Sequence, residues 1–172
     1  LMGRQVLEIE AAAVAALARR IGPEFCAAVA LILESRGRVV VSGIGKSGHI
    51  ARKLAATFAS TGTPAYFVHA AEAVHGDLGM ITRDDVLIAI SNSGENDELL
   101  TIVPLVKRQG GRLIAITGDP ASSLAREADA HLDAGVARRS ALTRPGVDAG
   151  RDRRRGRGTP ELDDLGVVGV GR

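Results

Sequence analysis

The chain has 172 residues, a length typical of one domain with a core of its own. Hydrophobic residues make up 45% of the chain and aromatic residues only 2%, which predicts an aliphatic core and argues against stacking platforms for single-stranded nucleic acid. The net charge of +2 arises at the end of the chain: residues 137–172 hold nine arginines and five acids, whereas residues 1–136 hold 13 basic and 15 acidic side chains. The charge therefore gives no reason to expect a nucleic-acid surface before residue 137.

The single cysteine, Cys26, excludes an intrachain disulfide and favours a reducing compartment. It lies in an apolar helical stretch, so we expect a buried structural thiol. No basic-then-apolar leader opens the chain, and no apolar run is long enough to span a membrane. These features predict a cytoplasmic protein without a membrane partner.

Helical and extended patterns alternate along the chain. Apolar residues at helical spacing predict helices over 5–20, 23–37, 47–61, 97–109 and 122–128. Short apolar runs predict strands over 39–41, 64–68, 86–90, 113–116 and 130–134. The run 86–90 is apolar at every position, as expected when both faces of a sheet are covered. This alternation predicts a parallel sheet between two helical layers, that is, a three-layer α/β/α domain.

Two serine-rich loops each follow an apolar run. Residues 42–49 (SGIGKSGH) follow the first predicted strand, and residues 91–96 (SNSGEN) follow the third. Both predict a strand, a tight hydroxyl-rich turn and a helix, and a helix N-terminus with nearby hydroxyls binds anions. Two such loops at the carboxyl ends of neighbouring parallel strands would hold one phosphate. The sequence therefore predicts a sugar-phosphate site.

A dinucleotide-binding oxidoreductase is an alternative, because Gly43, Gly45 and Gly48 fit the G-x-G-x-x-G pattern after a strand. That pattern alone is weak. The second serine loop favours a single phosphate over a dinucleotide, and absence of NAD binding would separate the two hypotheses.

Five segments carry a resemblance to a known family. They are 43–49, 58–64, 75–80, 90–95 and 116–118. In order and spacing the chain resembles the sugar isomerase (SIS) domain of the KpsF/GutQ-type arabinose 5-phosphate isomerases, over roughly residues 3–136. The stretch His-Gly-Asp-Leu-Gly-Met at 75–80 is the specific part, since the serine loops alone indicate only an SIS domain.

The resemblance implies a flavodoxin-like SIS fold and an aldose–ketose isomerase. The family interconverts D-arabinose 5-phosphate and D-ribulose 5-phosphate through an enediol and feeds synthesis of the lipopolysaccharide sugar Kdo. A small-molecule sugar phosphate is the implied partner, with no cofactor and no nucleic acid. The resemblance also implies a homo-oligomer. Metal-ligand spacing is missing from the sequence, so no metal site is predicted.

The resemblance assigns catalytic roles to three residues. Lys46 matches an active-site lysine, His75 a histidine implicated in catalysis, and Glu98 a carboxylate near the site. Each has a plainer interpretation: a solvated lysine, a structural histidine, and a glutamate favoured by the dipole of a helix N-terminus.

Six residues are the predicted phosphate ligands. Ser47, Ser91 and Ser93 match the phosphate-binding serines of SIS domains, although serines at these places also serve as simple helix caps. The complete predicted set is Gly45, Ser47, Ser91, Asn92, Ser93 and Asn96. Asn96 stands where the family usually has Ser or Thr, and its amide can still donate a hydrogen bond.

The match to the family stops after Val136. Arg138, Arg139 and Ser140 replace a region where the family has a carboxylate implicated in catalysis. We therefore expect N-terminal helices over 1–37, an SIS domain over 38–136, and an Arg/Gly-rich tail over 137–172 without the CBS domains of the family. The low-complexity composition of the tail predicts disorder. Translation in a shifted reading frame is one explanation of this composition.

This departure puts the activity of the chain in doubt. A truncated or frameshifted isomerase would have one sheet face without its covering helix and an incomplete proton-transfer site. The alternatives to an active isomerase are therefore an inactive truncated isomerase and a non-catalytic module that binds a sugar phosphate.

Overall fold

The computed structural model describes residues 2–74 and 76–136. The predictions made for His75 and for the tail over 137–172 lie outside these residues.

The centre of the fold is a five-stranded sheet in which every strand pair is parallel. The strands are β1 (Val39–Gly43), β2 (Ala65–Val68), β3 (Val86–Ser91), β4 (Arg112–Thr117) and β5 (Ala130–Asp133). Their order across the sheet is β2-β1-β3-β4-β5, the flavodoxin-like order. The prediction of a five-stranded parallel sheet is confirmed.

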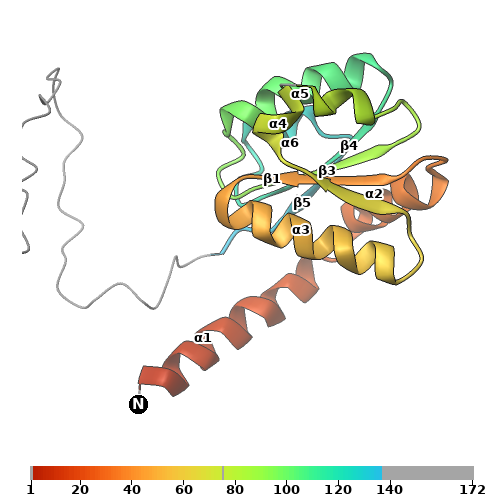
Figure 1. Cartoon of the computed structure of the whole chain (residues 1–172). Coiled ribbons are helices and arrows are strands. Elements are labelled where there is room, and N and C mark those ends of the chain that lie inside the picture. The colour runs from red at the N-terminus through yellow and green to blue at the C-terminus, as the bar shows by residue number, and fades with distance from the viewer. Residues whose placement is uncertain (1, 75, 137–172) are drawn as a thin grey trace, which may run out of the picture. The chain divides into compact units, whose positions relative to one another are not determined.

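Helices cover both faces of this sheet, which confirms the predicted three-layer arrangement (Figure 1). The α-helices are α1 (Met2–Leu17), α2 (Pro23–Glu34), α3 (Gly45–Ser60), α4 (Ala70–Val74), α5 (Asp97–Arg108) and α6 (Ser123–Glu127). Two 3-10 helices, η1 (Ala18–Arg20) and η2 (Asp77–Met80), complete the set in the described part of the chain. Helices α2 and α3 lie on one face, and α4, α5 and α6 lie on the other (Figure 1).

Alternation along the strands supplies the two halves of the core. Val40 and Leu87 point to the side of α4, α5 and α6, whereas Val41 and Ile88 point to the side of α2 and α3. Because both faces of the central strands are covered, their sequences are almost entirely apolar. At the carboxyl end, a row of three aliphatic side chains across β3, β4 and β5 is only half-buried on the α2–α3 face: Ile90, Ile116 and Leu132.

The amino ends of β1 and β3 are joined by one buried carboxylate. Asp85, whose side chain is 1% exposed, accepts hydrogen bonds from the backbone N–H groups of Arg38 on Oδ1 and Thr82 on Oδ2, both at 2.7 Å. The Thr82 hydroxyl and the Arg38 guanidinium add a hydrogen bond and an ion pair at 3.7 Å. Burial raises the pKa of Asp85, but these partners outweigh burial and hold the pKa below its ordinary value.

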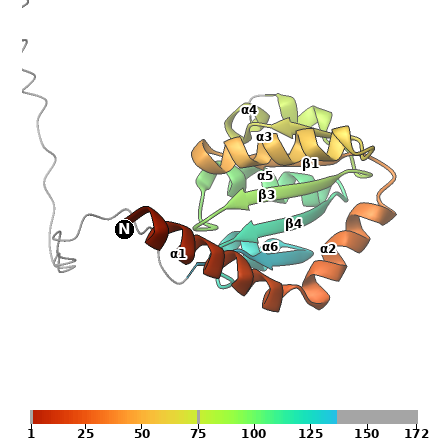
Figure 2. The same ribbon diagram turned by 90° about the horizontal axis from the view of Figure 1, so that it is seen from below.

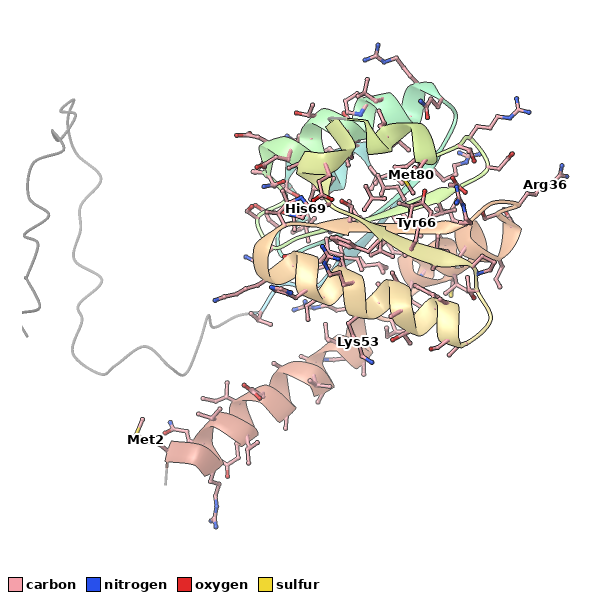
Figure 3. All side chains as sticks on the ribbon, in the orientation of Figure 1. Met2, Arg36, Lys53, Tyr66, His69 and Met80 are labelled. Carbon is pink, nitrogen blue, oxygen red and sulfur yellow. The ribbon has the colours of Figure 1, made fainter. Side chains whose placement is uncertain are left out.

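A second polar contact ties η2 to the sheet edge. The Tyr66 hydroxyl in β2 donates to the backbone oxygen of Met80 at 2.8 Å, and the two residues lie side by side in Figure 3. The Arg38 guanidinium also donates to that oxygen and lies over the Tyr66 ring, 4.6 Å from its centre. The segment that carries the 75–80 motif is therefore anchored at its far end.

The N-terminal helices depart from the sequence prediction in one respect. The sequence predicts a buried Cys26, and this is wrong, because the Cys26 side chain is exposed. Helix α2 buries Ala28 against the sheet, and Cys26 lies two residues away, on a different side of the helix. An apolar neighbourhood in sequence is therefore a poor guide to burial here. Figure 2 shows α1 and α2 together from below.

Within residues 2–74 and 76–136, no helix combines the length and apolar character needed to cross a membrane.

Replacing Asp85 by asparagine tests the carboxylate that joins β1 and β3. An amide offers one oxygen where two backbone N–H groups now donate, so Asp85→Asn is expected to lower the free energy of unfolding by about 1–3 kcal/mol. The measurement is urea denaturation at pH 7. Asp84→Asn is the matched control, because the hydrogen bonds that Asp84 receives from Ser35 and Gly37 end on its backbone oxygen.

The same contact predicts a pH dependence. Because the folded-state pKa of Asp85 is lowered, its contribution is fully present above the unfolded pKa of about 3.9 and is lost as the pH falls towards the folded value. The stability difference between wild type and Asp85→Asn should therefore shrink below about pH 4. Equal stabilities of the Asp84 and Asp85 variants at pH 7 would contradict the assignment.

Candidate active site

A pocket of about 250 Å³ opens at the carboxyl ends of β1 and β3. Its lining comes from the two serine-rich loops and the elements beside them: Ile44, Ser47, Ile90, Ser91, Asn92, Ser93, Asn96 and Leu99. β1 and β3 are neighbours, but β1 leads to β2 on one side and β3 leads to β4 on the other. The pocket therefore lies at the switch point of the sheet, where open α/β folds bind ligands.

The first loop turns directly from β1 into α3. Gly45 has φ +56°, a left-handed conformation that favours glycine, and it begins the helix. The Gly48 N–H donates to the Ile44 oxygen at 3.2 Å, so the N–H groups of Lys46 and Ser47 precede the hydrogen-bonded turns of α3. Ser47 lines the pocket at this helix N-terminus.

The second loop, residues 91–96, is called the serine loop below. Its two serines accept hydrogen bonds from its own backbone: Ser91 Oγ from the Gly94 N–H at 3.1 Å and Ser93 Oγ from the Glu95 N–H at 3.3 Å. An accepting hydroxyl still has its own hydrogen to donate. Both serines line the pocket, with that donor available for an acceptor inside it.

Asn96 is the N-cap of α5. Its Oδ1 accepts from the Leu99 N–H at 3.0 Å, and its amide nitrogen donates to Glu98 Oε2 at 2.8 Å. The Asn96 side chain therefore keeps one amide hydrogen for a ligand. Glu98 is exposed in the first turn of α5, where the helix dipole favours a carboxylate.

The structure brings together five of the six predicted phosphate ligands. Ser47, Ser91, Asn92, Ser93 and Asn96 line the one pocket. Gly45 shapes the turn but does not line the pocket, and the predicted catalytic residues Lys46 and Glu98 are exposed outside its lining. His75 is not among the described residues.

The pocket is suited to an anion. It combines hydroxyl and amide donors with the N-termini of α3 and α5, helices of 16 and 12 residues, whose free N–H groups and dipoles favour negative charge. Among residues 2–74 and 76–136, no group of three His, Cys, Asp or Glu side chains is placed to hold a metal ion.

Sequence reasoning missed Glu95. This residue does not line the pocket, and its carboxylate accepts from the Ser123 N–H at 2.7 Å. The two residues are 28 positions apart in the sequence, so no local pattern predicts their contact.

The comparisons with known proteins agree with this geometry. The model of the SIS domain matches residues 32–147, which is most of the chain and includes both loops of the pocket. The chain belongs to the SIS domain family. The predicted domain limits of 38–136 stay a prediction.

The relatives are sugar-phosphate isomerases by name. An arabinose 5-phosphate isomerase, KdsD, of Pseudomonas aeruginosa is 55% identical over 133 residues, covering 77% of this chain and 41% of the relative. The KdsD of Escherichia coli K12 is also 55% identical, over 79% of this chain and 42% of the relative. This chain thus spans about two fifths of the length of these curated relatives.

One similar solved structure contains a bound ligand. A protein of Escherichia coli CFT073 in complex with arabinose 5-phosphate is similar with a TM-score of 0.68 and 47% identity, covering 77% of this chain and 72% of that chain. The fold of this SIS domain is therefore one in which a relative has been seen with this sugar phosphate.

Proposed function

We propose that this SIS domain binds a pentose phosphate and belongs to an isomerase of D-arabinose 5-phosphate and D-ribulose 5-phosphate. The observation that carries the proposal is the pocket between β1 and β3, where five predicted phosphate ligands meet at two helix N-termini. The 55% identity to KdsD proteins and the arabinose 5-phosphate complex of a 47% identical relative support the substrate class. The product would serve as a precursor of Kdo, and the single cysteine favours the cytoplasm as its location.

The phosphate is the anchor of the substrate in this proposal. Its oxygens accept from the hydroxyls of Ser47, Ser91 and Ser93 and from free N–H groups of the two helices. This binding energy holds the sugar carbons in place above the sheet. Asn92 and Asn96 supply the remaining donors, and Gly45 gives the turn its tight form.

Isomerisation moves a proton between C1 and C2 and moves the carbonyl in the opposite direction. A base removes the proton from the carbon beside the carbonyl, and the carbonyl oxygen gains a proton to give an enediol. The base then returns its proton to the former carbonyl carbon, while the neighbouring hydroxyl loses its proton and becomes the new carbonyl. We assign the base to His75 or Glu98 and stabilisation of the developing oxyanion to Lys46. Lys46 and Glu98 belong to the first turns of α3 and α5, next to the pocket residues Ser47 and Asn96.

Binding without turnover is the second candidate. The resemblance expects a catalytic carboxylate in the region where this chain has Arg138, Arg139 and Ser140. A guanidinium or a hydroxyl does not accept a proton at neutral pH as a carboxylate does. We therefore expect this chain to bind the sugar phosphate and to isomerise it weakly or not at all.

A homo-oligomer is also part of the proposal. None of the 16 residues of helix α1 is buried, and two of its large apolar side chains, Leu7 and Val14, are each 68% exposed. The apolar exposure continues at helical spacing into α2, where Leu33 is 79% exposed. Helices in proteins gain most of their stability from packing an apolar face, so a second copy of this chain is the proposed cover of this surface.

Binding is tested by titration calorimetry with D-arabinose 5-phosphate. Ser47→Ala and Ser93→Ala each remove one donor to a charged oxygen and should weaken binding about tenfold. Ser60→Ala is the matched control: Ser60 ends α3, away from the pocket, and donates to Thr57. Unphosphorylated arabinose and NADH should not bind, and tight NADH binding would instead favour the dinucleotide alternative.

Turnover is tested by NMR in heavy water, where isomerisation exchanges the carbon-bound proton for deuterium. The expected result is saturable binding with little conversion, and Lys46→Met should remove any residual conversion while Lys53→Met, on the same helix α3, leaves it unchanged. Rapid conversion by the 172-residue protein would overturn the expectation of weak activity.

Oligomerisation is tested by sedimentation. Val14→Glu places a charge in the exposed apolar surface of α1 and should shift the protein towards monomer, whereas Ala15→Glu, an exposed neighbour without a large apolar side chain, should not. A wild-type monomer at micromolar concentration would contradict the assembly.

A further inference from the structure

The serine loop rests on the segment that runs from the end of β4 into the first turn of α6. Three of its residues in a short stretch accept hydrogen bonds from that segment: the Asn92 oxygen from the Gly118 N–H at 3.0 Å, the Gly94 oxygen from the Leu124 N–H at 3.1 Å, and the Glu95 carboxylate from the Ser123 N–H at 2.7 Å. None of the three donors belongs to the lining of the pocket. These donors, called the support below, therefore contact the loop on a side other than the pocket.

Close packing at Gly94 fixes the loop against this support. Gly94 has φ +67°, and a Cβ atom there would overlap the side chain of Ser122. Ser122 is itself buried and donates to the Asp119 oxygen at 2.7 Å. The loop thus sits on a side chain that has its own partner and is not free to move aside.

The buried base of the support reaches the edge strand. Thr117 Oγ1, at the end of β4, donates to the Asp119 oxygen at 2.8 Å and lies 2.8 Å from His131 Nε2 in β5. The segment that carries Ser122 and Ser123 is in this way joined to two strands of the sheet.

Glu95 connects the pocket to this support through one residue. Its N–H donates to Ser93 Oγ at 3.3 Å, on the pocket side, and its carboxylate accepts from the Ser123 N–H on the other side. The N–H and the hydroxyl of Ser123, with the nearby Arg126 guanidinium, hold the pKa of Glu95 below its ordinary value. The carboxylate is therefore charged at neutral pH, and its hydrogen bond is charge-assisted.

We infer that Glu95 is a positioning residue for the phosphate site: its carboxylate holds the serine loop on Ser123, so that Ser93 Oγ faces the pocket. The inference rests on the proposed function, because it concerns binding at the same pocket. Glu95 itself does not touch the phosphate. Its contribution is to reduce the number of loop conformations that binding would otherwise have to select.

Two substitutions break the same hydrogen bond from opposite ends. Glu95→Ala removes the acceptor. Ser123→Pro removes the donor and leaves Glu95 intact. Ser123 is the first residue of α6, where proline suits the helix, and Ser122 before it already has φ −66° and ψ 158°, which a following proline permits.

Both variants should weaken binding of D-arabinose 5-phosphate and of inorganic phosphate about tenfold, as expected for loss of a charge-assisted hydrogen bond that orders the loop. The double variant should bind no more weakly than either single variant, since both substitutions remove the same hydrogen bond. Ser123→Ala keeps the N–H donor and should therefore weaken binding far less than Ser123→Pro, and Glu127→Ala, which removes the acid of α6, should bind as wild type does.

Amide exchange by NMR supplies a readout without ligand. In both Glu95→Ala and Ser123→Pro, the backbone amides at positions 94 and 95, which in the wild type donate to Ser91 Oγ and Ser93 Oγ, should exchange faster, whereas the amides of β3 should be unchanged.

Wild-type affinity in both variants would overturn the positioning role and leave the proposed function standing. A wild-type protein that binds neither ligand would overturn the proposed function and the positioning role together. Weakened binding in Ser123→Ala equal to that in Ser123→Pro would also overturn the inference, because the hydroxyl rather than the Glu95 hydrogen bond would then be responsible.

Discussion

The pairing of β1 with β3 is the constraint on which the candidate site depends. These strands are hydrogen-bonded in register from Val39 with Val86 to Gly43 with Ile90. They therefore end together, and the two serine-rich loops leave the sheet at the same level. From there, α3 crosses to one face and α5 to the other, so the loops diverge and leave a pocket between them. A shift of register would move one helix N-terminus away from the other.

A contact at the opposite, amino end of β1 and β3 helps to specify that register. Apolar packing alone is a weak guide to the position of one strand along another when both strands are uniformly aliphatic. The Asp85 carboxylate adds a directional contact, because its two oxygens take N–H groups that belong to the start of β1 and to the turn before β3. A buried charge with unsatisfied oxygens would be costly, so this contact penalises other registers at the end of the sheet far from the pocket.

At the pocket, the predicted phosphate ligands and the candidate catalytic side chains occupy different places. The residues that line it are mostly small and polar, and the serine hydroxyls of the serine loop accept hydrogen bonds from the loop's own backbone N–H groups, which suits a site preorganised for an anion. The candidate catalytic side chains Lys46 and Glu98 stand exposed beside it. Under the proposed function, this arrangement would place the phosphate in the pocket and the reacting carbons beside the exposed Lys46 and Glu98. The half-buried row of Ile90, Ile116 and Leu132 lies at the same end of the sheet, where apolar surface remains available for burial.

Most helices and strands, and the chemistry of the two serine-rich loops, could be predicted from the sequence alone. Aliphatic runs specify strands covered on both faces, and the serines, glycines and asparagines after two of those runs specify turns with spare donors, since these are properties of short segments. The packing of the whole chain establishes that β1 and β3 are neighbours, that Ser47 and Ser93 share one pocket, and that Lys46 and Glu98 lie outside its lining. It also decided that Cys26 is exposed and that Glu95 is bonded to Ser123, 28 residues away. Burial and long-range partners depend on how whole elements pack, and that information is spread over residues no local pattern connects.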